Sequence, residues 1–282
     1  MKNIPVYMDC FYETTHMRSI DNHDIELVKI KVPFDNDDVV KEWASSFRKK
    51  FISNVDLNDM IVATQAASPY KFLTDYIYPD KVSGNIVRIG DFGEILVADY
   101  LMFIRNYWIP SLLTRYSQKQ NKDKSTMGTD IFAIKLADKS ISNNPKDELC
   151  ICEVKTGFSD KAKKRLTDAV LDVNKDNVEI ADRRASVSLA ATMLTLKRRS
   201  DISPSYIDQI RRFQNPLDNP FKESYLAAAV IDETQIRRKS LEAVPTVDSP
   251  HKENLKLITF HGEDLKKLMD ALYGEFGVSD LE

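Results

Sequence analysis

The sequence predicts an α/β fold in which a mixed central β-sheet is flanked by α-helices, with an N-terminal α+β extension. Residues 149–155 and 225–232 are short runs that are apolar on both faces, a pattern typical of central strands covered on both sides. Helical patterns lie around them, including the almost wholly apolar run 94–104 and the striped run 183–197. Strands and helices that follow one another in this way favour a layered α/β architecture.

The chain divides into a first block, residues 1 to about 80, and a core, residues 81–282. In the first block, residues 5–12 and 25–32 have strand patterns and residues 39–51 have helical spacing. No residues there have catalytic spacing. We expect this block to extend the sheet, contact a partner or shape the substrate groove.

The core contains further elements. The pattern predicts strands at 131–136 and 255–260, and helices at 161–180, 207–213 and 265–273. The apolar, aromatic segment 108–116 fits either a third core strand or an extension of the preceding helix.

Composition limits the class of protein. Of the 282 residues, 43% are hydrophobic, enough for a sizeable core. No run is long and apolar enough to span a bilayer, and the N-terminus lacks the apolar centre of a signal peptide. Two of the three cysteines alternate in strand 149–155, which indicates reduced core thiols and a cytoplasmic location.

The net charge of −3 does not indicate nucleic-acid binding, but the helical region 161–215 is basic. Such asymmetry can place a DNA-binding surface beside an acidic site. Solvated helix faces explain the same charges equally well. The candidate nucleic-acid-binding residues are Lys161, Lys163, Lys164, Arg165, Lys197, Arg198 and Arg199.

Glu153 and Lys155 stand at the end of strand 149–155. Because side chains alternate along a strand, the two share one face of the sheet. A carboxylate and an ammonium group therefore emerge together from the end of an otherwise apolar strand.

Asp130 directly precedes the strand candidate 131–136. The polar segment 137–147, which joins this strand to the next, is typical of a hairpin loop. If the turn centres near residues 141 and 142, antiparallel pairing puts Asp130 opposite Glu153, with about 5 Å between their Cβ atoms.

Two carboxylates this close repel one another unless a cation lies between them. Oxygen ligands suit Mg²⁺ or Mn²⁺. A neighbouring lysine can hold a water molecule or offset negative charge on a phosphate. The arrangement predicts metal-assisted phosphodiester hydrolysis.

Glu94 is an anomaly in the apolar run 94–104, because a buried carboxylate is costly without a partner. A metal ion or its waters is one explanation. Helix capping is the other, since Asp91 and Glu94 would lie in the first turn of a helix that begins at the glycines. The extreme apolarity of the run favours the metal site.

Glu-x-Lys alone occurs by chance in many strands, but Asp130 at hairpin spacing makes the pattern more specific. The set Asp130, Glu153 and Lys155 resembles the PD-(D/E)xK nuclease superfamily, although Thr129 stands where that motif has proline. The resemblance implies a restriction-endonuclease-like core. It also implies that Glu94, in a Gly-x-x-Gly-Glu element on the first core helix, joins the site.

Three motifs together, at residues 90–94, 128–130 and 152–156, resemble the HamA family, the nuclease subunits of the Hachiman anti-phage system. The resemblance is specific over residues 90–156 and loose elsewhere. It implies a Mg²⁺-dependent DNase, action on DNA when infection is sensed, and a helicase partner, HamB, that restrains the activity.

Our hypothesis makes Asp130 and Glu153 metal ligands, with the backbone carbonyl of Val154 as a third oxygen. Lys155 positions the attacking water or offsets charge on the scissile phosphate, and Glu94 binds the metal directly or through water. Two alternatives stay open. The chain could be a non-catalytic, nuclease-like subunit that binds a partner, or a stand-alone structure-specific or RNA nuclease.

Overall fold

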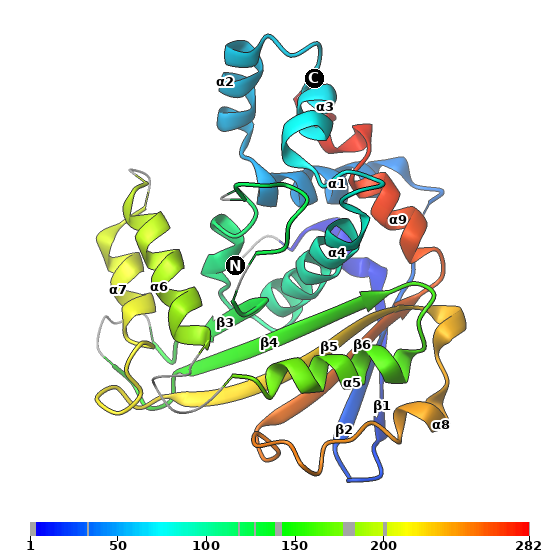
Figure 1. Cartoon of the computed structure of the whole chain (residues 1–282), viewed down its shortest axis with the longest axis vertical. Helices are drawn as coiled ribbons and strands as arrows, with labels where there is room; N and C mark the ends of the chain where they lie inside the picture. Colours follow the sequence, from blue (N-terminus) through cyan, green and yellow to red (C-terminus); the bar gives the residue numbers. More distant parts are fainter. Residues whose placement is uncertain are drawn as a thin grey trace.

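The computed structural model describes residues 4–32, 34–117, 119–126, 128–138, 143–176, 184–199 and 202–281. Within these ranges a six-stranded mixed sheet has the order β1-β2-β6-β5-β4-β3 (Figure 1). The strands are β1 (Phe11–Arg18), β2 (Asp24–Ile30), β3 (Ile131–Lys135), β4 (Glu148–Gly157), β5 (Lys222–Asp232) and β6 (Leu255–Gly262). The α/β class and the mixed sheet, consistent with a restriction-endonuclease-like core, are thus confirmed.

The four inner strands, β2, β6, β5 and β4, run parallel to one another, whereas the edge strands β1 and β3 pair antiparallel with β2 and β4. Of the three roles expected for the first block, extension of the sheet is seen, because β2 pairs with β6. The role of this block in partner contact stays a prediction.

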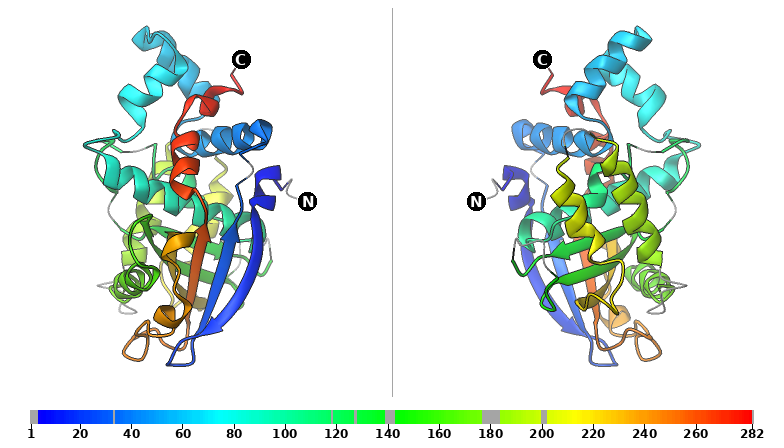
Figure 2. Two further views of the ribbon diagram at one scale, coloured as in Figure 1. Left: turned by 90° about the vertical axis from the view of Figure 1, so that its right-hand side faces the viewer. Right: turned by 90° about the vertical axis from the view of Figure 1, so that its left-hand side faces the viewer.

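Helices cover both faces of the sheet, which is why β4 and β5 are apolar on both sides (Figures 1 and 2). One face packs against α5 (Ala162–Val173), α6 (Arg184–Lys197), α7 (Pro204–Arg211) and α8 (Arg238–Leu241). The other face packs against α1 (Asp37–Phe51), α4 (Asn85–Asp99) and α9 (Leu265–Leu272).

The remaining elements are short or peripheral. Helices α2 (Asn54–Thr64) and α3 (Pro69–Phe72) project beyond the end of the sheet, at the top of Figure 1. Single 3₁₀ or π turns form η1 (Val6–Cys10), η2 (Leu73–Ile77), η3 (Tyr100–Ile104), η4 (Pro110–Leu113), η6 (Glu233–Gln235) and η7 (Glu275–Val278).

The strand expected at residues 5–12 is wrong. Most of this segment forms η1 (Val6–Cys10), and β1 begins only at Phe11. Tyr7 explains the difference. Its ring stacks on Trp43 and its hydroxyl donates to Asp99 at 3.1 Å, so tertiary contacts hold the turn against α1 and α4.

Helix α4 begins at Asn85, five residues before Gly90, and Asp91 and Glu94 therefore lie in its interior. Capping of a first turn is excluded as the reason for these two acidic residues. Gly93 lies where the helix meets the sheet, since a Cβ there would lie 1.8 Å from Thr156 Oγ1. The glycine is needed for close packing of α4 on β4.

The segment 108–116 is neither a core strand nor a helix extension. Trp108 makes a single antiparallel bridge to Ile134, and Pro110 then starts η4. The helix expected at 161–180 ends at Val173, and residues 177–183 lie outside the described ranges. None of the described helices is long and apolar enough to cross a membrane.

Candidate functional site

The hairpin register brings Asp130 and Glu153 together. Ile131 lies opposite Cys152 in the β3–β4 ladder, so Asp130, one residue earlier, lies opposite Glu153 as predicted. Asp130 Oδ2 also accepts a hydrogen bond of 3.0 Å from the backbone N–H of Val154. Because a residue's N–H and C=O share one edge of a strand, the Val154 carbonyl lies on this edge too.

Glu153 is 97% buried, and its carboxyl group lies within hydrogen-bonding reach of Asp130. Burial, followed by the charge of Asp130, raises the pKa of Glu153 to about 8. Arg184 and Lys155 lower it only in part. The pair therefore tends to hold a proton, and a cation between the two groups would remove that tendency.

The backbone conformation of the two residues before Asp130 helps to position this side chain. Gly128 has a φ of +97°, and a Cβ there would lie 2.5 Å from Ser188 Oγ on α6. Thr129 then donates its backbone N–H to the same hydroxyl at 3.0 Å. Proline has no N–H to donate, which gives a physical reason for its absence from this motif.

Arg115 joins Glu94 to Asp130. Its Nε donates to Glu94 Oε2 at 2.8 Å and its Nη2 donates to Asp130 Oδ1 at 3.1 Å. Its Nη1 donates to the carbonyl of Thr129 at 2.8 Å, and the Tyr116 hydroxyl donates to Glu94 at 3.0 Å. Glu94 is therefore brought to the site as expected, but through an arginine.

The pKa of Glu94 is raised to about 7, because burial and the charges of Asp130 and Asp91 together outweigh the lowering effect of Arg115. Asp91 has its own buried partner, Lys119, at 2.5 Å. The interior of α4 thus carries two carboxylates, each neutralised by a cation from the segment that follows the helix.

Sequence reasoning missed Arg115. One signal could have found it. Arg115 is a basic residue within the apolar, aromatic segment 108–116, and a buried cation requires a nearby carboxylate. Glu94 was the unexplained buried carboxylate.

Lys155 shares the face of Glu153 but forms an ion pair with Asp172 on α5. Burial lowers the pKa of Lys155, but Asp172 and Asp130 outweigh this, so the net pKa is raised and the ammonium form is favoured. Arg184 lies 3.7 Å from Glu153 and donates to the carbonyls of Gly128 and Asp172. Sequence reasoning also missed Asp172 and Arg184, for which no local pattern gives a signal.

The HamA family profile matches residues 5–276 of the 282. The chain belongs to the HamA family. This membership supports a place in the Hachiman anti-phage defence system. A comparison with curated proteins finds no match to this HamA-family chain.

The donor set at Asp130 and Glu153 fits an oxygen-ligated cation, because two carboxyl groups face each other there and the charge of Asp130 helps to raise the pKa of Glu153. The described part of the chain holds no group of three or more His, Cys, Asp or Glu side chains placed to bind a metal. Arg115 accounts for this, since it stands between Glu94 and Asp130. The ligand set that fits such a cation consists of the carboxylates of Asp130 and Glu153, the Val154 carbonyl and water.

The basic residues fall into two groups on different helices of this HamA-family chain. Lys161, Lys163, Lys164 and Arg165 surround the start of α5, whereas Lys197, Arg198 and Arg199 surround the end of α6. Lys164 and Arg165 both pair with Asp160. Lys197 and Arg198 are exposed and follow the helix that holds Ser188.

Proposed function

We propose that this HamA-family chain is a divalent-cation-dependent DNA endonuclease that works with, and is restrained by, the helicase subunit HamB. The proposal rests chiefly on one observation. Asp130, directly before β3, lies opposite Glu153 in β4, and Lys155 lies two residues further along β4 on the face of Glu153. Carboxylates and an ammonium group in this order suit hydrolysis of a phosphodiester.

Asp130 and Glu153 would hold Mg²⁺ or Mn²⁺, with the carbonyl of Val154 as a further oxygen. When bound, such an ion polarises a phosphoryl oxygen and lowers the pKa of a coordinated water. The ammonium group of Lys155 offsets negative charge on the phosphate, and Asp172 holds that group in place. Glu94 positions Arg115, which in turn orients Asp130.

The test is cleavage of plasmid DNA by the purified chain, with and without HamB, in Mg²⁺, Mn²⁺ or EDTA. Asp130→Asn and Glu153→Gln should each abolish the ion-dependent products, and Lys155→Ala should slow their formation strongly. Parallel assays on duplex DNA, single-stranded DNA and RNA decide the substrate class. Ion-independent cleavage, or cleavage that survives both carboxylate variants, would contradict the proposal.

A second candidate function is a nuclease-like subunit that binds a partner without catalysis. The observation that favours it is the ion pairing of the site, since Arg115 and Arg184 both lie against its carboxylates. The two functions differ in one measurement. A purely structural subunit stays inactive with HamB present on every substrate and in every divalent ion, yet still binds the helicase.

A further inference from the structure

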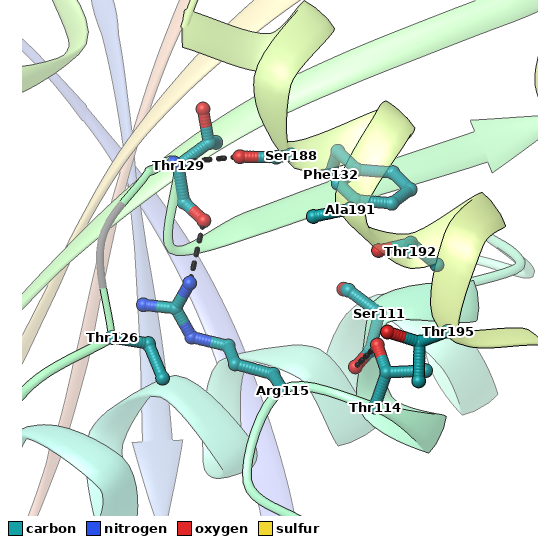
Figure 3. A pocket seen from close by; sticks show the side chains of 10 residues that line it. All are labelled: Ser111, Thr114, Arg115, Thr126, Thr129, Phe132, Ser188, Ala191, Thr192 and Thr195. Carbon is teal, nitrogen blue, oxygen red and sulfur yellow. Dashed lines mark hydrogen bonds between the residues drawn. The ribbon is translucent and has the colours of Figure 1, made fainter. Parts of the chain in front are cut away.

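A cavity of about 200 Å³ lies beside the carboxylate pair, between η4, β3 and α6 (Figure 3). Hydroxyl side chains make up most of its wall. The lining residues are Ser111, Thr114, Arg115, Thr126, Thr129, Phe132, Ser188, Ala191, Thr192 and Thr195. The volume is below the range of about 300–1,000 Å³ usual for drug-sized ligands, so the cavity suits one small group.

Several of these hydroxyl groups are not used in hydrogen bonds that stabilise the described fold. Those of Ser111, Thr126, Thr192 and Thr195 form no hydrogen bond to any other residue within the described ranges. Thr192 is 95% buried, and its side chain faces the cavity from α6 (Figure 3). Although the residue is buried, its hydroxyl is not among the fully enclosed unpaired side-chain atoms of the described residues, so it is open to the cavity. A ligand with hydrogen-bonding groups would find an available donor and acceptor there.

The cavity selects a neutral ligand. Among the described residues of the lining, Arg115 alone is charged, and it already donates to Glu94 and Asp130 and to the carbonyl of Thr129. A phosphate would find no uncommitted positive charge there. Phe132 and Ala191 add an apolar wall. Hydroxyl groups both donate and accept hydrogen bonds, which suits the polar edge of a nucleobase. The ring of Phe132 suits the flat face of the same base.

The cavity lies close to the carboxylate of Asp130. Phe132 follows Asp130 by two residues on the same edge strand, so the two side chains share one face of the sheet, about 7 Å apart along the strand. A base in the cavity would therefore have its phosphodiester linkage within one nucleotide of Asp130.

We propose that this cavity receives one unstacked nucleobase of the strand to be cleaved. This inference rests on the proposed nuclease function and narrows its substrate class. A base that is paired and stacked in a duplex has to leave its helix to enter a pocket of this size, so the substrate is single-stranded or locally opened DNA.

The test uses the full chain in EDTA, so that no cleavage occurs. Ligand-observed NMR titrations with the four 2′-deoxynucleosides, and with 2-deoxyribose alone, measure binding to the cavity directly. The probe variant is Thr192→Val/Thr195→Val, which removes two hydroxyls and keeps the side-chain shapes. Thr64→Val, on the exposed end of α2, is the matched control.

At least one deoxynucleoside should bind saturably to the unaltered chain and to the control, and bind about tenfold more weakly to the double variant, as expected for two lost hydrogen bonds. Deoxyribose should bind less than any nucleoside that binds. Absence of saturable binding, equal binding to the double variant, or equal binding of deoxyribose each overturns the inference.

The same samples separate the two proposals. If Mg²⁺-dependent cleavage is present but no nucleoside binds, the inference about the cavity fails and the nuclease function stands. If nucleosides bind through Thr192 and Thr195 but no substrate is cleaved with HamB present, the nuclease function fails and the nucleobase site stands.

Discussion

The carboxylate of Asp130 accepts a 3.0 Å hydrogen bond from the backbone N–H of Val154, which lies 24 residues later in the chain. This contact ties the residue directly before β3 to β4, next to the first pair of the ladder between the two strands. It also directs one oxygen of Asp130 to β4, while Arg115 takes the other. The carboxylate is thereby held opposite Glu153 before any ligand arrives.

Asp130→Ala and Glu153→Ala should each abolish Mg²⁺-dependent cleavage while the chain stays folded. Each variant removes one of the two carboxylates that would hold the ion, and Glu153→Ala also removes a buried carboxyl group with a raised pKa. The measurement is plasmid cleavage together with circular dichroism. Asp59→Ala on the exposed face of α2 is the control and should cleave normally. Full activity in either site variant would end the assignment.

Arg115→Met should lower the free energy of unfolding by about 3–5 kcal/mol, because it leaves Glu94 buried without its cation. Urea denaturation measures this loss. Adding Glu94→Gln should restore part of it, since the charge left without a partner is then gone. Arg198→Met, at an exposed position, should change stability little. A loss equal to that of the control would show that the Arg115 network does not support the fold.

Stability without divalent ions should fall as the pH rises from about 4.5 to about 8. In the folded state burial and Asp130 raise the pKa of Glu153 above its ordinary value of 4.5, so folding favours its neutral form. The contribution of Glu153 is therefore present in acid and lost as the pH passes through the folded pKa. The raised pKa of Glu94, about 7, acts in the same direction.

Glu153→Gln is the variant that isolates this effect. In EDTA, urea unfolding of this variant should depend less on pH across the same window than unfolding of the unaltered chain. Glu242→Gln, an exposed glutamate after α8, should keep the original profile. Identical pH profiles for the two variants would contradict the raised pKa of Glu153.

Lys155→Ala should leave Mn²⁺ affinity nearly unchanged and slow cleavage by about a hundredfold or more, because the ammonium group acts on the phosphate rather than on the ion. Asp172→Asn should slow cleavage less, since the lysine loses its anchor but keeps its charge. Calorimetry and a cleavage assay separate the two effects. Lys175→Ala, on the exposed side of Asp172, is the control. Loss of Mn²⁺ binding in Lys155→Ala would count against this role.

Lys197→Ala/Arg198→Ala should weaken DNA binding more than Lys164→Ala. Lys164 is held by Asp160, whereas Lys197 and Arg198 are exposed and follow the cavity residue Thr195 by two and three residues. Binding isotherms at several salt concentrations measure the effect, and each lost phosphate contact should lower the salt slope by about 1. A larger loss from Lys164→Ala would place the DNA along α5 instead.

Local sequence determined the pairing of β3 with β4. Alternation along a strand is a property of consecutive residues, so the shared face of Glu153 and Lys155 could be predicted. Loop length set the register, which is why Asp130 was expected opposite Glu153 and is found there. Helix α4 was predicted to start too late, because its first turns carry no apolar stripe as regular as the one that follows Gly93.

Tertiary structure alone decided what surrounds these carboxylates. Arg115 comes from an irregular segment, and its side chain reaches Glu94 and Asp130 only because η4 folds back beside α4 and β3. The hydroxyls of α6 likewise form a cavity wall only where that helix faces η4. The physical reason is that periodicity is a local property of the chain, whereas these contacts join residues far apart in the sequence. Periodicity specifies which side of an element a residue occupies, whereas the packing of separate elements decides which sides meet.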